Sequence, residues 1–446
     1  MTAREAALKA LIAYRRYDAR PEQALDRLIV GFNLSERDAA LATRILNGVL
    51  QNMMLLDHYI GHLSSIGIKK LEPAVLDILR LSIYQLVFLD KIPPNAAVNE
   101  GVALVRKTAS PRAGGFANAV LRKAALAAKS GDLPEIGGGA ARRLSVGYSH
   151  PEWLVRKLFE VLDAGSAERF LMANNEPDVP VYAQVNTLLT DTDSALVSLA
   201  AEAAEARRHE WLDGCVRLRG ARKVTRLDAF QKGLIYVQDA AARLAVAAAG
   251  PKPGDVVIDG CAAPGGKSFA AAIAMKNKGR VVAFDINGEK LRHIAEGAGR
   301  LGVTIIDAME KDASAPEAAL AGKADAVLAD VPCSGFGVIR KKPEIRYKTD
   351  EGTAGLPGLQ VRILSALSSY VKPGGALLYS TCTVLRRENE DVVNLFLQEN
   401  SGFSKEGFRL PGIGHVESGE LTLWPQIHGT DGFYICKLRR APRYTR

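Results

Sequence analysis

The chain has 446 residues, of which 48% are hydrophobic and 24% are charged, and this balance excludes a disordered or low-complexity protein. Its 58 lysine and arginine residues exceed its 49 aspartate and glutamate residues, and the resulting net charge of +9 favours a polyanionic partner. No stretch of roughly 18 uninterrupted apolar residues is present, which argues against a membrane-spanning helix. The start of the chain lacks the apolar core of a signal peptide, so we expect a cytoplasmic protein that makes no membrane contact.

The five cysteines predict neither disulfides nor a zinc site. Their number is odd, and no Cys-x-x-Cys pair occurs, which favours a reducing compartment. His58 and His62 have the spacing of a zinc pair, but the glutamate of the His-Glu-x-x-His motif is missing. We therefore expect no metal site.

Residues 1–130 predict an all-helical domain, because apolar residues recur there at spacings of three and four. Residues 73–89 form its most apolar stretch and are expected to be a buried helix. This part holds 18 lysine and arginine residues against 11 acidic ones, so it carries +7 of the net charge. Residues 131–150 begin with a Gly-rich stretch and are predicted to be a linker.

Residues 151–234 predict a small α+β domain that connects the helical part to the rest of the chain. Helical patterns cover residues 153–162 and 194–207, and short strand patterns cover residues 181–185 and 215–218. From residue 235 to residue 446 the pattern changes to short apolar runs that end in an acidic or small residue. These runs, at residues 256–259, 281–285, 326–330 and 376–380, predict buried parallel strands of an α/β sheet.

A loop of small residues follows the first of these strands, at positions 259–268. Backbone amides in such a loop can approach a ligand at a helix N-terminus, and Asp285 follows about 20 residues later, where an acid accepts hydrogen bonds from a ribose. The loop therefore predicts a nucleoside-containing cofactor. A nucleotide triphosphatase is disfavoured because the P-loop pattern misses by one position, and a dinucleotide enzyme because Gly-x-Gly-x-x-Gly is absent.

Two cysteines follow strands at the ligand-bearing edge of the predicted sheet. Cys333 lies after the strand that ends at Asp330, and Cys382 lies after the strand at residues 376–380. Their small polar neighbours suit accessible thiolates. Cys215, Cys261 and Cys436 are interpreted as packing residues.

A basic cluster follows the Pro-Cys loop. It either is a solvated charged surface or grips RNA phosphates, with Tyr347 available for base stacking. Residues 388–391 are interpreted as a solvated helix start. The predicted RNA-binding cations are Arg340, Lys341, Lys342, Arg346 and Lys348.

Several long motifs together resemble the NOL1/NOP2/Sun family of RNA (cytosine-5) methyltransferases, and the helical part resembles the NusB-like RNA-binding domain. This pairing is similar to the arrangement of the bacterial ribosomal RNA small subunit methyltransferase B group. Phe336, Val331 and Thr383 depart from the common family residues, and Phe336 bears on the base pocket. The resemblance rests on residues 259–267, 330–345, 380–384 and 431–434, and on residues 79–86, 92–100 and 116–122 of the helical part.

The resemblance implies a NusB-like domain, a small middle domain that helps to bind RNA, and a Rossmann-like class I methyltransferase domain that acts on 16S ribosomal RNA. We expect a monomer. The resemblance assigns Cys382 as the nucleophile that adds to cytosine C6 and Cys333 as the group that assists product release. Asp330 is expected at the cytosine edge, although it could instead cap its turn. The implied S-adenosylmethionine site comprises Cys261, Ala262, Ala263, Pro264, Gly265, Gly266, Lys267, Asp285, Asp312 and Asp330.

Three alternatives stay open. The residues alone do not settle which cysteine attacks, since cytosine-5 DNA methyltransferases use the Pro-Cys cysteine, which here is Cys333. The same chemistry could act on transfer RNA or 23S ribosomal RNA. A non-catalytic RNA-binding assembly or antitermination-like factor is the third alternative, but the intact Cys333, Cys382, Asp330 and glycine loop favour an enzyme.

Overall fold

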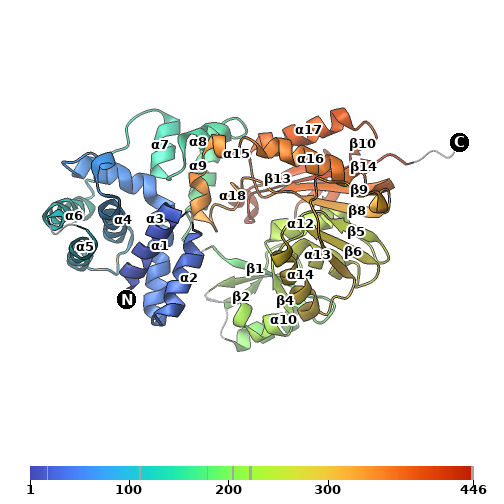
Figure 1. Ribbon diagram of the computed structural model, residues 1–446, viewed down its shortest axis with the longest axis horizontal. Helices are drawn as coiled ribbons and strands as arrows, with labels where there is room; N and C mark the ends of the chain where they lie inside the picture. Colours follow the sequence, from blue (N-terminus) through green and yellow to red (C-terminus); the bar gives the residue numbers. More distant parts are fainter. Residues whose placement is uncertain (18, 110–111, 178, 203–204, 220–223, 443–446) are drawn as a thin grey trace. The chain divides into compact units, whose positions relative to one another are not determined.

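The computed structural model describes residues 1–17, 19–109, 112–177, 179–202, 205–219 and 224–442, and the chain separates into two compact units (Figure 1). Unit 1 comprises residues 1–177 and the short segment 342–347. Unit 2 comprises residues 178–341 and 348–446. Within the described ranges, no helix has both the length and the apolar character that crossing a membrane requires.

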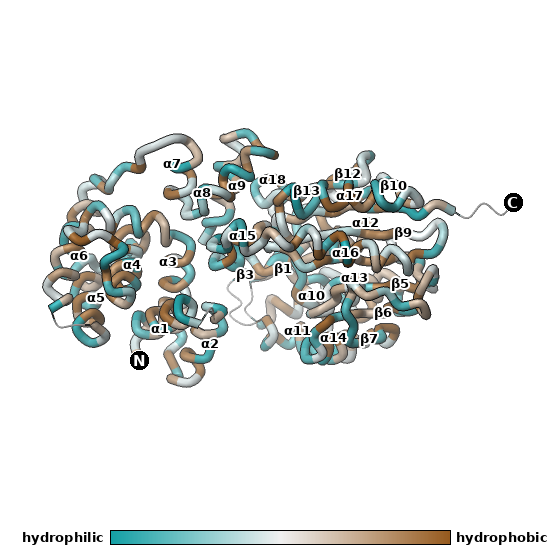
Figure 2. Tube along the Cα trace, turned by 45° about the horizontal axis from the view of Figure 1, so that its top comes forward, coloured by the Kyte–Doolittle hydropathy of each residue, from teal (hydrophilic) through white to brown (hydrophobic). Residues whose placement is uncertain are grey.

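Unit 1 is built from helices, as the sequence predicts. Prolines occupy the first turn of α2, α4 and α5, where the missing amide hydrogen costs no helical bond. Hydrophobic and hydrophilic segments alternate along these helices (Figure 2), and the α4 residues Ile78, Leu79 and Leu81 are fully buried. The first six helices are α1 (Ala3–Tyr17), α2 (Pro21–Gly31), α3 (Glu36–Leu63), α4 (Pro73–Phe88), α5 (Pro94–Thr108) and α6 (Ala113–Ser130).

Three shorter helices complete unit 1: α7 (Ala140–Gly147), α8 (Glu152–Leu158) and α9 (Ala164–Asn174). Helix α7 lies inside the segment 131–150, which the sequence predicts to be a linker. The segment is helical there because Ala141 and Val146 are buried and α7 packs on α3 and α8. Within the predicted linker, the Gly-bearing stretch 131–139 and residues 148–150 lie outside a helix. The helix predicted at residues 153–162 ends earlier, at Leu158.

Unit 2 begins with a small antiparallel sheet of order β2-β3-β1-β4, so the middle of the chain has the expected α+β character. The helix predicted at residues 194–207 is wrong at its end, because residues 205–208 pair with β3 as an edge strand. Glu and Arg favour helices in isolation, but backbone pairing with a neighbouring strand overrides that preference. The elements are β1 (Val181–Val185), α10 (Thr192–Ala201), β2 (Glu205–Arg208), β3 (Cys215–Arg219), α11 (Asp228–Gln231) and β4 (Ile235–Val237).

The large sheet of unit 2 contains the four predicted parallel strands and has the order β10-β14-β9-β8-β5-β6-β7, with β13 beside β14. Strands β5 to β9 run parallel, and β14 pairs antiparallel with β9. The strands are β5 (Val256–Asp259), β6 (Arg280–Asp285), β7 (Ile306–Glu310), β8 (Ala324–Asp330), β9 (Val371–Thr381), β10 (Phe403–Lys405), β13 (Glu420–Leu423) and β14 (Phe433–Arg440).

Helices cover both faces of this sheet and bury its continuous apolar strands (Figure 1). One face packs against α12 (Ala240–Ala249), α13 (Gly266–Ala274) and α14 (Gly288–Leu301), and the other against α16 (Leu356–Ser368) and α17 (Glu390–Glu399). Smaller elements are α15 (Asp350–Thr353), α18 (Pro425–His428), β11 (Phe408–Leu410) and β12 (Gly414–Val416). The parallel strands thus end together, and their last residues include Asp259, Asp285 and Asp330.

Candidate active site

The loop between β5 and α13 is held close to the carboxyl ends of its neighbouring strands. The Gly260 amide donates to the Leu328 carbonyl at 2.9 Å, and the Ala262 amide donates to the Phe284 carbonyl at 2.7 Å. Gly265 has a φ of +109°, and a Cβ there would lie 2.6 Å from the Phe269 ring, so only glycine fits. The loop therefore presents the N-terminus of α13 at the edge of the sheet.

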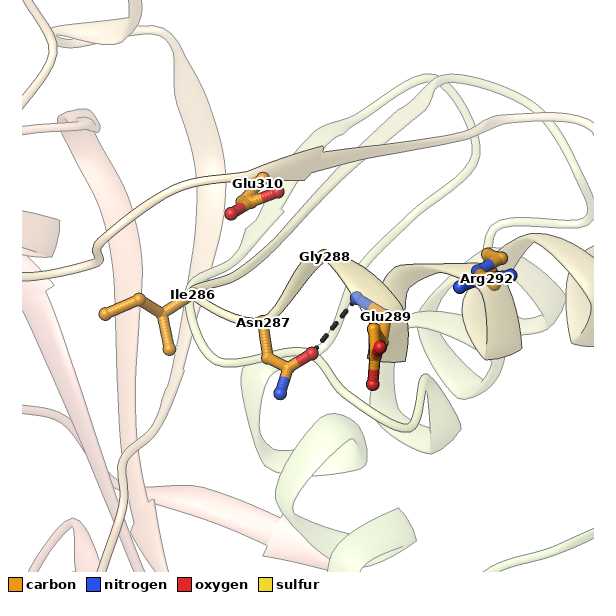
Figure 3. Close-up of a pocket in the computed structure, with 6 residues that line it drawn as sticks. All are labelled: Ile286, Asn287, Gly288, Glu289, Arg292 and Glu310. Carbon is orange, nitrogen blue, oxygen red and sulfur yellow. Dashed lines mark hydrogen bonds between the residues drawn. The ribbon is translucent and has the colours of Figure 1, made fainter.

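Asp285 ties this loop to the end of β6. Its carboxylate accepts hydrogen bonds from the Ala263 amide at 3.2 Å and from the Asn287 amide at 3.0 Å. Beyond it lies an open hollow of about 690 Å³ lined by Ile286, Asn287, Gly288, Glu289, Arg292 and Glu310 (Figure 3). No motif in the sequence pointed to these lining residues; their one signal was the position of residues 286–292 after the acid of β6.

Two further acids flank the strand ends. Asp312, two residues beyond β7, is exposed, and hydrogen bonds from the Ser314 amide and hydroxyl lower the pKa of its carboxyl group. Asp259 is fully buried and accepts a hydrogen bond from the Ser268 hydroxyl at 2.7 Å. Burial raises the pKa of Asp259 to about 6, and its Oδ1 has no partner among the described residues. Sequence reasoning placed no function on Asp259.

Asp330 forms an ion pair with Lys267, whose Nζ lies 2.5 Å from Oδ2 of the carboxylate. The Ser380 hydroxyl donates to the other carboxylate oxygen at 2.8 Å, and Lys267 Nζ also lies 5.3 Å from the centre of the Phe433 ring. Although burial disfavours the charge of Lys267, the nearby Asp330 carboxylate raises the pKa of Lys267 above its usual value. The loop lysine, whose role the sequence left open, is thus the partner of the Pro-Cys strand acid.

The two predicted thiols lie side by side, with 3.2 Å between the Sγ atoms of Cys333 and Cys382. The hydrogen bond from the Cys333 thiol lowers the pKa of Cys382, and the Lys267 charge acts in the same direction. The same contact, together with burial, raises the pKa of Cys333. Within this pair, Cys382 is therefore the thiol that ionises first.

Family models match three consecutive parts of the chain: the NusB family at residues 1–126, the ferredoxin-like domain of RsmF/B-like methyltransferases at 150–225, and the 16S rRNA methyltransferase RsmB/F at 246–439. The chain is 37% identical to the probable ribosomal RNA small subunit methyltransferase B of Bacillus subtilis strain 168, over 98% of each chain. It is 33% identical to the protein with the same description from Synechocystis, over 99% of this chain and 100% of that one.

The chain belongs to the RsmB/F family of 16S ribosomal RNA methyltransferases. The crystal structure of PH0851 is similar over 98% of both chains, with 26% sequence identity and a TM-score of 0.82. These comparisons confirm the predicted family, the NusB-like helical domain and the methyltransferase fold, and they make RNA the class of partner.

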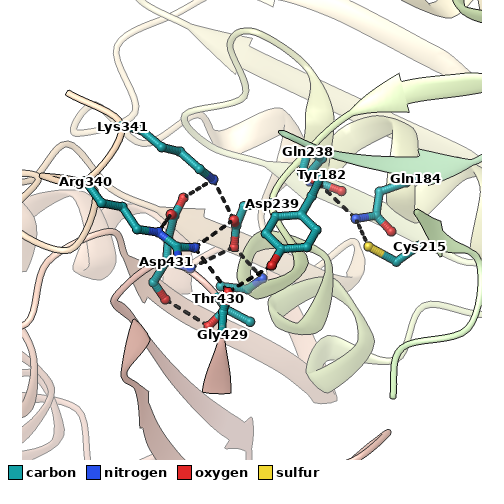
Figure 4. Close-up of polar contacts among 11 residues, drawn as sticks. Tyr182, Gln184, Cys215, Gln238, Asp239, Arg340, Lys341, Gly429, Thr430 and Asp431 are labelled. Atoms are coloured by element: carbon teal, nitrogen blue, oxygen red, sulfur yellow. Dashed lines mark hydrogen bonds and ion pairs between the residues drawn. The ribbon is translucent and has the colours of Figure 1, made fainter. Parts of the chain in front are cut away.

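The structure corrects the prediction that Arg340 and Lys341 of this family member contact RNA. Arg340 Nε donates to Asp431 at 3.0 Å, and Lys341 Nζ lies 2.6 Å from Asp239 and 2.8 Å from Asp431 (Figure 4). These four side chains form an ionic cluster, which we call the latch; its two acids and Arg340 are buried, and Lys341 is 28% exposed. The latch joins the start of α12 to the segment before β14. Both acids lie about 90 to 100 residues away in sequence, which hid the pairing.

The rest of the basic cluster also differs from a cationic surface. Arg346 is fully buried in unit 1, donates to the Gln51 carbonyl and to Asn175 Oδ1 at 2.7 Å each, and burial lowers the pKa of Arg346 to about 10. The Tyr347 hydroxyl donates to the Leu50 carbonyl at 2.7 Å and is committed to the protein. Lys342 and Lys348 are exposed, although Lys348 Nζ also donates to the Ser334 carbonyl.

The remaining cysteines are packing residues, as expected. Cys215 and Cys436 are fully buried, and burial raises the pKa of each to about 12. Gln184 Nε2 donates to the Cys215 sulfur at 3.3 Å (Figure 4). Burial also raises the pKa of Cys261. Among the described residues, no group of three or more His, Cys, Asp or Glu side chains could hold a metal ion.

Proposed function

We propose that this chain transfers a methyl group from S-adenosylmethionine to C5 of a cytosine in 16S ribosomal RNA through a covalent bond between Cys382 and C6. The observation that carries this proposal is the pair of thiols 3.2 Å apart, which lies beside the ion pair of Lys267 and Asp330. A packing role would explain one buried thiol, but not two thiols at the strand ends beside an ion pair.

The chemistry requires one thiolate, and a second acid/base group beside it assists the release of the product. Cytosine C5 is a poor nucleophile, and addition of the Cys382 thiolate to C6 makes C5 electron-rich enough to attack a methyl sulfonium. Removal of the C5 proton then restores the C5–C6 double bond and expels the Cys382 thiolate. Cys333 lies next to the leaving sulfur, so it serves as the acid/base group of this release step.

Asp330 and Lys267 serve the base during this sequence. The Asp330 carboxylate accepts a hydrogen bond from the amino group on the Watson–Crick edge, which orients the ring over Cys382. Attack at C6 places negative charge on the ring, and the Lys267 ammonium beside Asp330 offsets it. The side chain of Asp330 is 26% exposed, so a base can reach it.

The loop after β5 fits the cofactor. The α13 N-terminus offers free amides, Gly265 excludes a Cβ that would fill the loop, and the hollow beyond Asp285 has room for a nucleoside. Asp285 would bind the ribose and Asp312 the adenine. When bound, S-adenosylmethionine supplies the electrophilic methyl group. The residues that would hold it are Cys261, Ala262, Ala263, Pro264, Gly265, Gly266, Lys267, Asp285, Asp312 and Asp330.

The NusB-like part supplies the salt-sensitive grip on RNA, because residues 1–130 carry +7 of the +9 net charge. Lys342 and Lys348 are the exposed cations left from the basic cluster. The target cytosine must leave any stack to reach Cys382, which favours a single-stranded or loop region of the RNA. We propose a monomer that acts in the cytoplasm.

The test incubates the purified chain with labelled S-adenosylmethionine and, separately, 16S ribosomal RNA, 23S ribosomal RNA and transfer RNA, and then locates 5-methylcytosine by bisulfite sequencing. We expect one methylated cytosine in 16S RNA alone. Methylation of another RNA would replace the substrate, and no methylation of any RNA would favour the non-catalytic assembly factor.

A further inference from the structure

Residues 388 and 389 occupy positions that differ from the solvated helix start that the sequence predicts. Glu388 is fully buried and Asn389 is 1% exposed. They lie where a 3₁₀ turn (Arg386–Glu388) meets α17, directly behind the two cysteine loops. A buried carboxylate is costly unless its oxygens are bound, so the partners of Glu388 identify what holds it there.

Glu388 holds the loop of Cys333. Its Oε2 accepts hydrogen bonds from the Ser334 amide at 2.8 Å and from Gln360 Nε2 at 3.0 Å. The same Gln360 nitrogen donates to the Pro332 carbonyl at 3.0 Å. The backbone groups on both sides of Cys333 are therefore bound by one carboxylate and one amide.

Asn389 holds the loop of Cys382 in the same manner. Its Oδ1 accepts a hydrogen bond from the Thr381 hydroxyl at 2.6 Å, and its Nδ2 donates to the Thr383 carbonyl at 3.1 Å. The residues on both sides of Cys382 are thus fixed by a single side chain. The side chains of Thr381, Thr383 and Asn389 are excluded from solvent, which shields these bonds from competing water.

The two loops are also joined to each other. The Ser334 and Thr383 hydroxyls lie 2.8 Å apart, and the Gly337 amide donates to the Cys382 carbonyl at 2.9 Å. We propose that Glu388 and Asn389 are positioning residues that hold the Cys333 and Cys382 loops in register and so set the short distance between the two thiols. This inference rests on the proposed function for its consequence in catalysis, but the geometry of the thiols does not depend on it.

The unmet hydrogen-bonding capacity of this group points in the same direction. Oε1 of Glu388 and Oε1 of Gln360 are both buried without a partner among the described residues. Packing alone would favour an apolar side chain at such a place, since unsatisfied buried oxygens are destabilising. Residues that cost stability yet bind the backbone on each side of a reactive thiol are typical of a site in which position matters more than stability.

The test compares Glu388→Ala and Asn389→Ala with Glu388→Gln, which keeps an acceptor oxygen for the Ser334 amide. Asn400→Ala is the matched control, because Asn400 caps the other end of α17 and its side chain donates to the Phe396 carbonyl, away from both cysteine loops. Two quantities are measured: the affinity for phenylarsine oxide, whose arsenic bonds to two neighbouring thiols with loss of water, and kcat for methyl transfer. Cys333→Ala gives the background of the arsenical assay.

We expect both alanine variants to bind phenylarsine oxide about 10²-fold more weakly, because the two sulfurs no longer act as one chelating pair. We expect kcat to fall about 10²-fold, because misplaced reacting groups slow the chemistry, whereas KM for the methyl donor stays the same. In Glu388→Gln, the affinity for phenylarsine oxide and kcat should both stay within about threefold of the wild-type values. Unchanged arsenical affinity in both alanine variants, or equal losses in Asn400→Ala, would overturn the proposal.

If the alanine variants do not fold, Gln360→Leu and Asn389→Ser take their place, because each removes contacts to one loop with a smaller change in volume. Weaker arsenical binding by the folded Gln360→Leu protein supports the inference, and unchanged binding contradicts it. If the wild-type chain methylates no RNA, the proposed function fails, while the arsenical measurement still decides whether Glu388 and Asn389 hold the thiols together.

Discussion

Two polar clusters of unit 2 use the same charged groups for opposite purposes. At the carboxyl ends of the parallel strands, Lys267 and Asp330 form an ion pair beside the two thiols, and their side chains are 12% and 26% exposed. In the latch, Arg340 and Asp431 are 4% and 7% exposed, Lys341 is 28% exposed, and each cation has acidic partners. The latch balances two cations with two acids and binds segments of the fold together, whereas the single pair beside the thiols leaves its acid accessible to a substrate.

The largest effect on activity, with little effect on stability, is expected when the proposed nucleophile is replaced. We expect Cys382→Ala to lower methyl transfer on the order of 10⁴- to 10⁶-fold, because C5 is not activated without the thiolate. The melting temperature should stay close to that of the wild type. Activity is measured by single-turnover methyl transfer, with Cys215→Ala as the thiol outside the edge. Substantial activity in the Cys382→Ala protein would contradict the assignment of Cys382 as the nucleophile.

The latch is tested by Asp431→Ala, which leaves Arg340 and Lys341 with one acidic partner. We expect the free energy of unfolding to fall by about 3–5 kcal/mol, because breaking a buried ion pair leaves charge without compensation. Urea denaturation measures this change. The matched Asp330→Ala variant should lose much less stability, and equal losses at the two sites would erase the distinction between them.

Asp330→Asn tests the ion pair between Lys267 and Asp330 by its effect on kcat. We expect kcat to fall on the order of 10²- to 10³-fold, because a fixed charge that faces the reacting ring is lost while the shape is kept. The unfolding free energy should change little. A variant with wild-type kcat would show that Asp330 only caps its turn.

The pH dependence tests the proton held between the thiols. The hydrogen bond from Cys333 lowers the pKa of Cys382, so its thiolate forms at a lower pH than that of an ordinary cysteine. The rate of iodoacetamide reaction at Cys382 should rise with pH at this lowered midpoint. Removal of the Cys333 hydrogen bond in Cys333→Ala, or of the positive charge in Lys267→Met, should move the midpoint upward. A downward shift in either variant contradicts the assignment.

The smallest effect is expected for an exposed cation. We expect Lys348→Ala to weaken RNA binding at all sequences alike and to reduce the slope of log affinity against log salt by about 1. Filter binding at several salt concentrations measures the slope. Lys372, which is paired with Asp325, provides the control lysine. An unchanged slope for Lys348→Ala would show that Lys348 does not contact an RNA phosphate and would leave the helical domain as the proposed RNA-binding part.

Much of the site could be predicted from the sequence because its residues follow apolar strands. Parallel strands end at one edge, so Asp285, Asp330, Cys333 and Cys382 were expected to lie near one another, and the two thiols do meet. The continuous apolar runs predicted the four central strands, and apolar spacings of three and four predicted the helical N-terminal part.

What the sequence did not reveal depends on partners far away along the chain. The local sequence predicts that Arg340 binds phosphate, but in the structure Arg340 forms ion pairs with Asp239 and Asp431. Glu388 looked solvated because acids are common at helix starts, but its amide partners come from two other segments. Neither local charge nor periodicity contains this information, because burial is set by tertiary packing.

The most direct test of the central claim traps the covalent intermediate. Cys333→Ala protein is incubated with 16S ribosomal RNA and S-adenosylmethionine, digested with nuclease and protease, and examined by mass spectrometry for a nucleotide bound to a cysteine peptide. We expect an accumulated adduct on the peptide that contains Cys382, and none in Cys382→Ala. An adduct on Cys333 in the Cys382→Ala protein, with none in Cys333→Ala, would contradict the assignment of the two thiols.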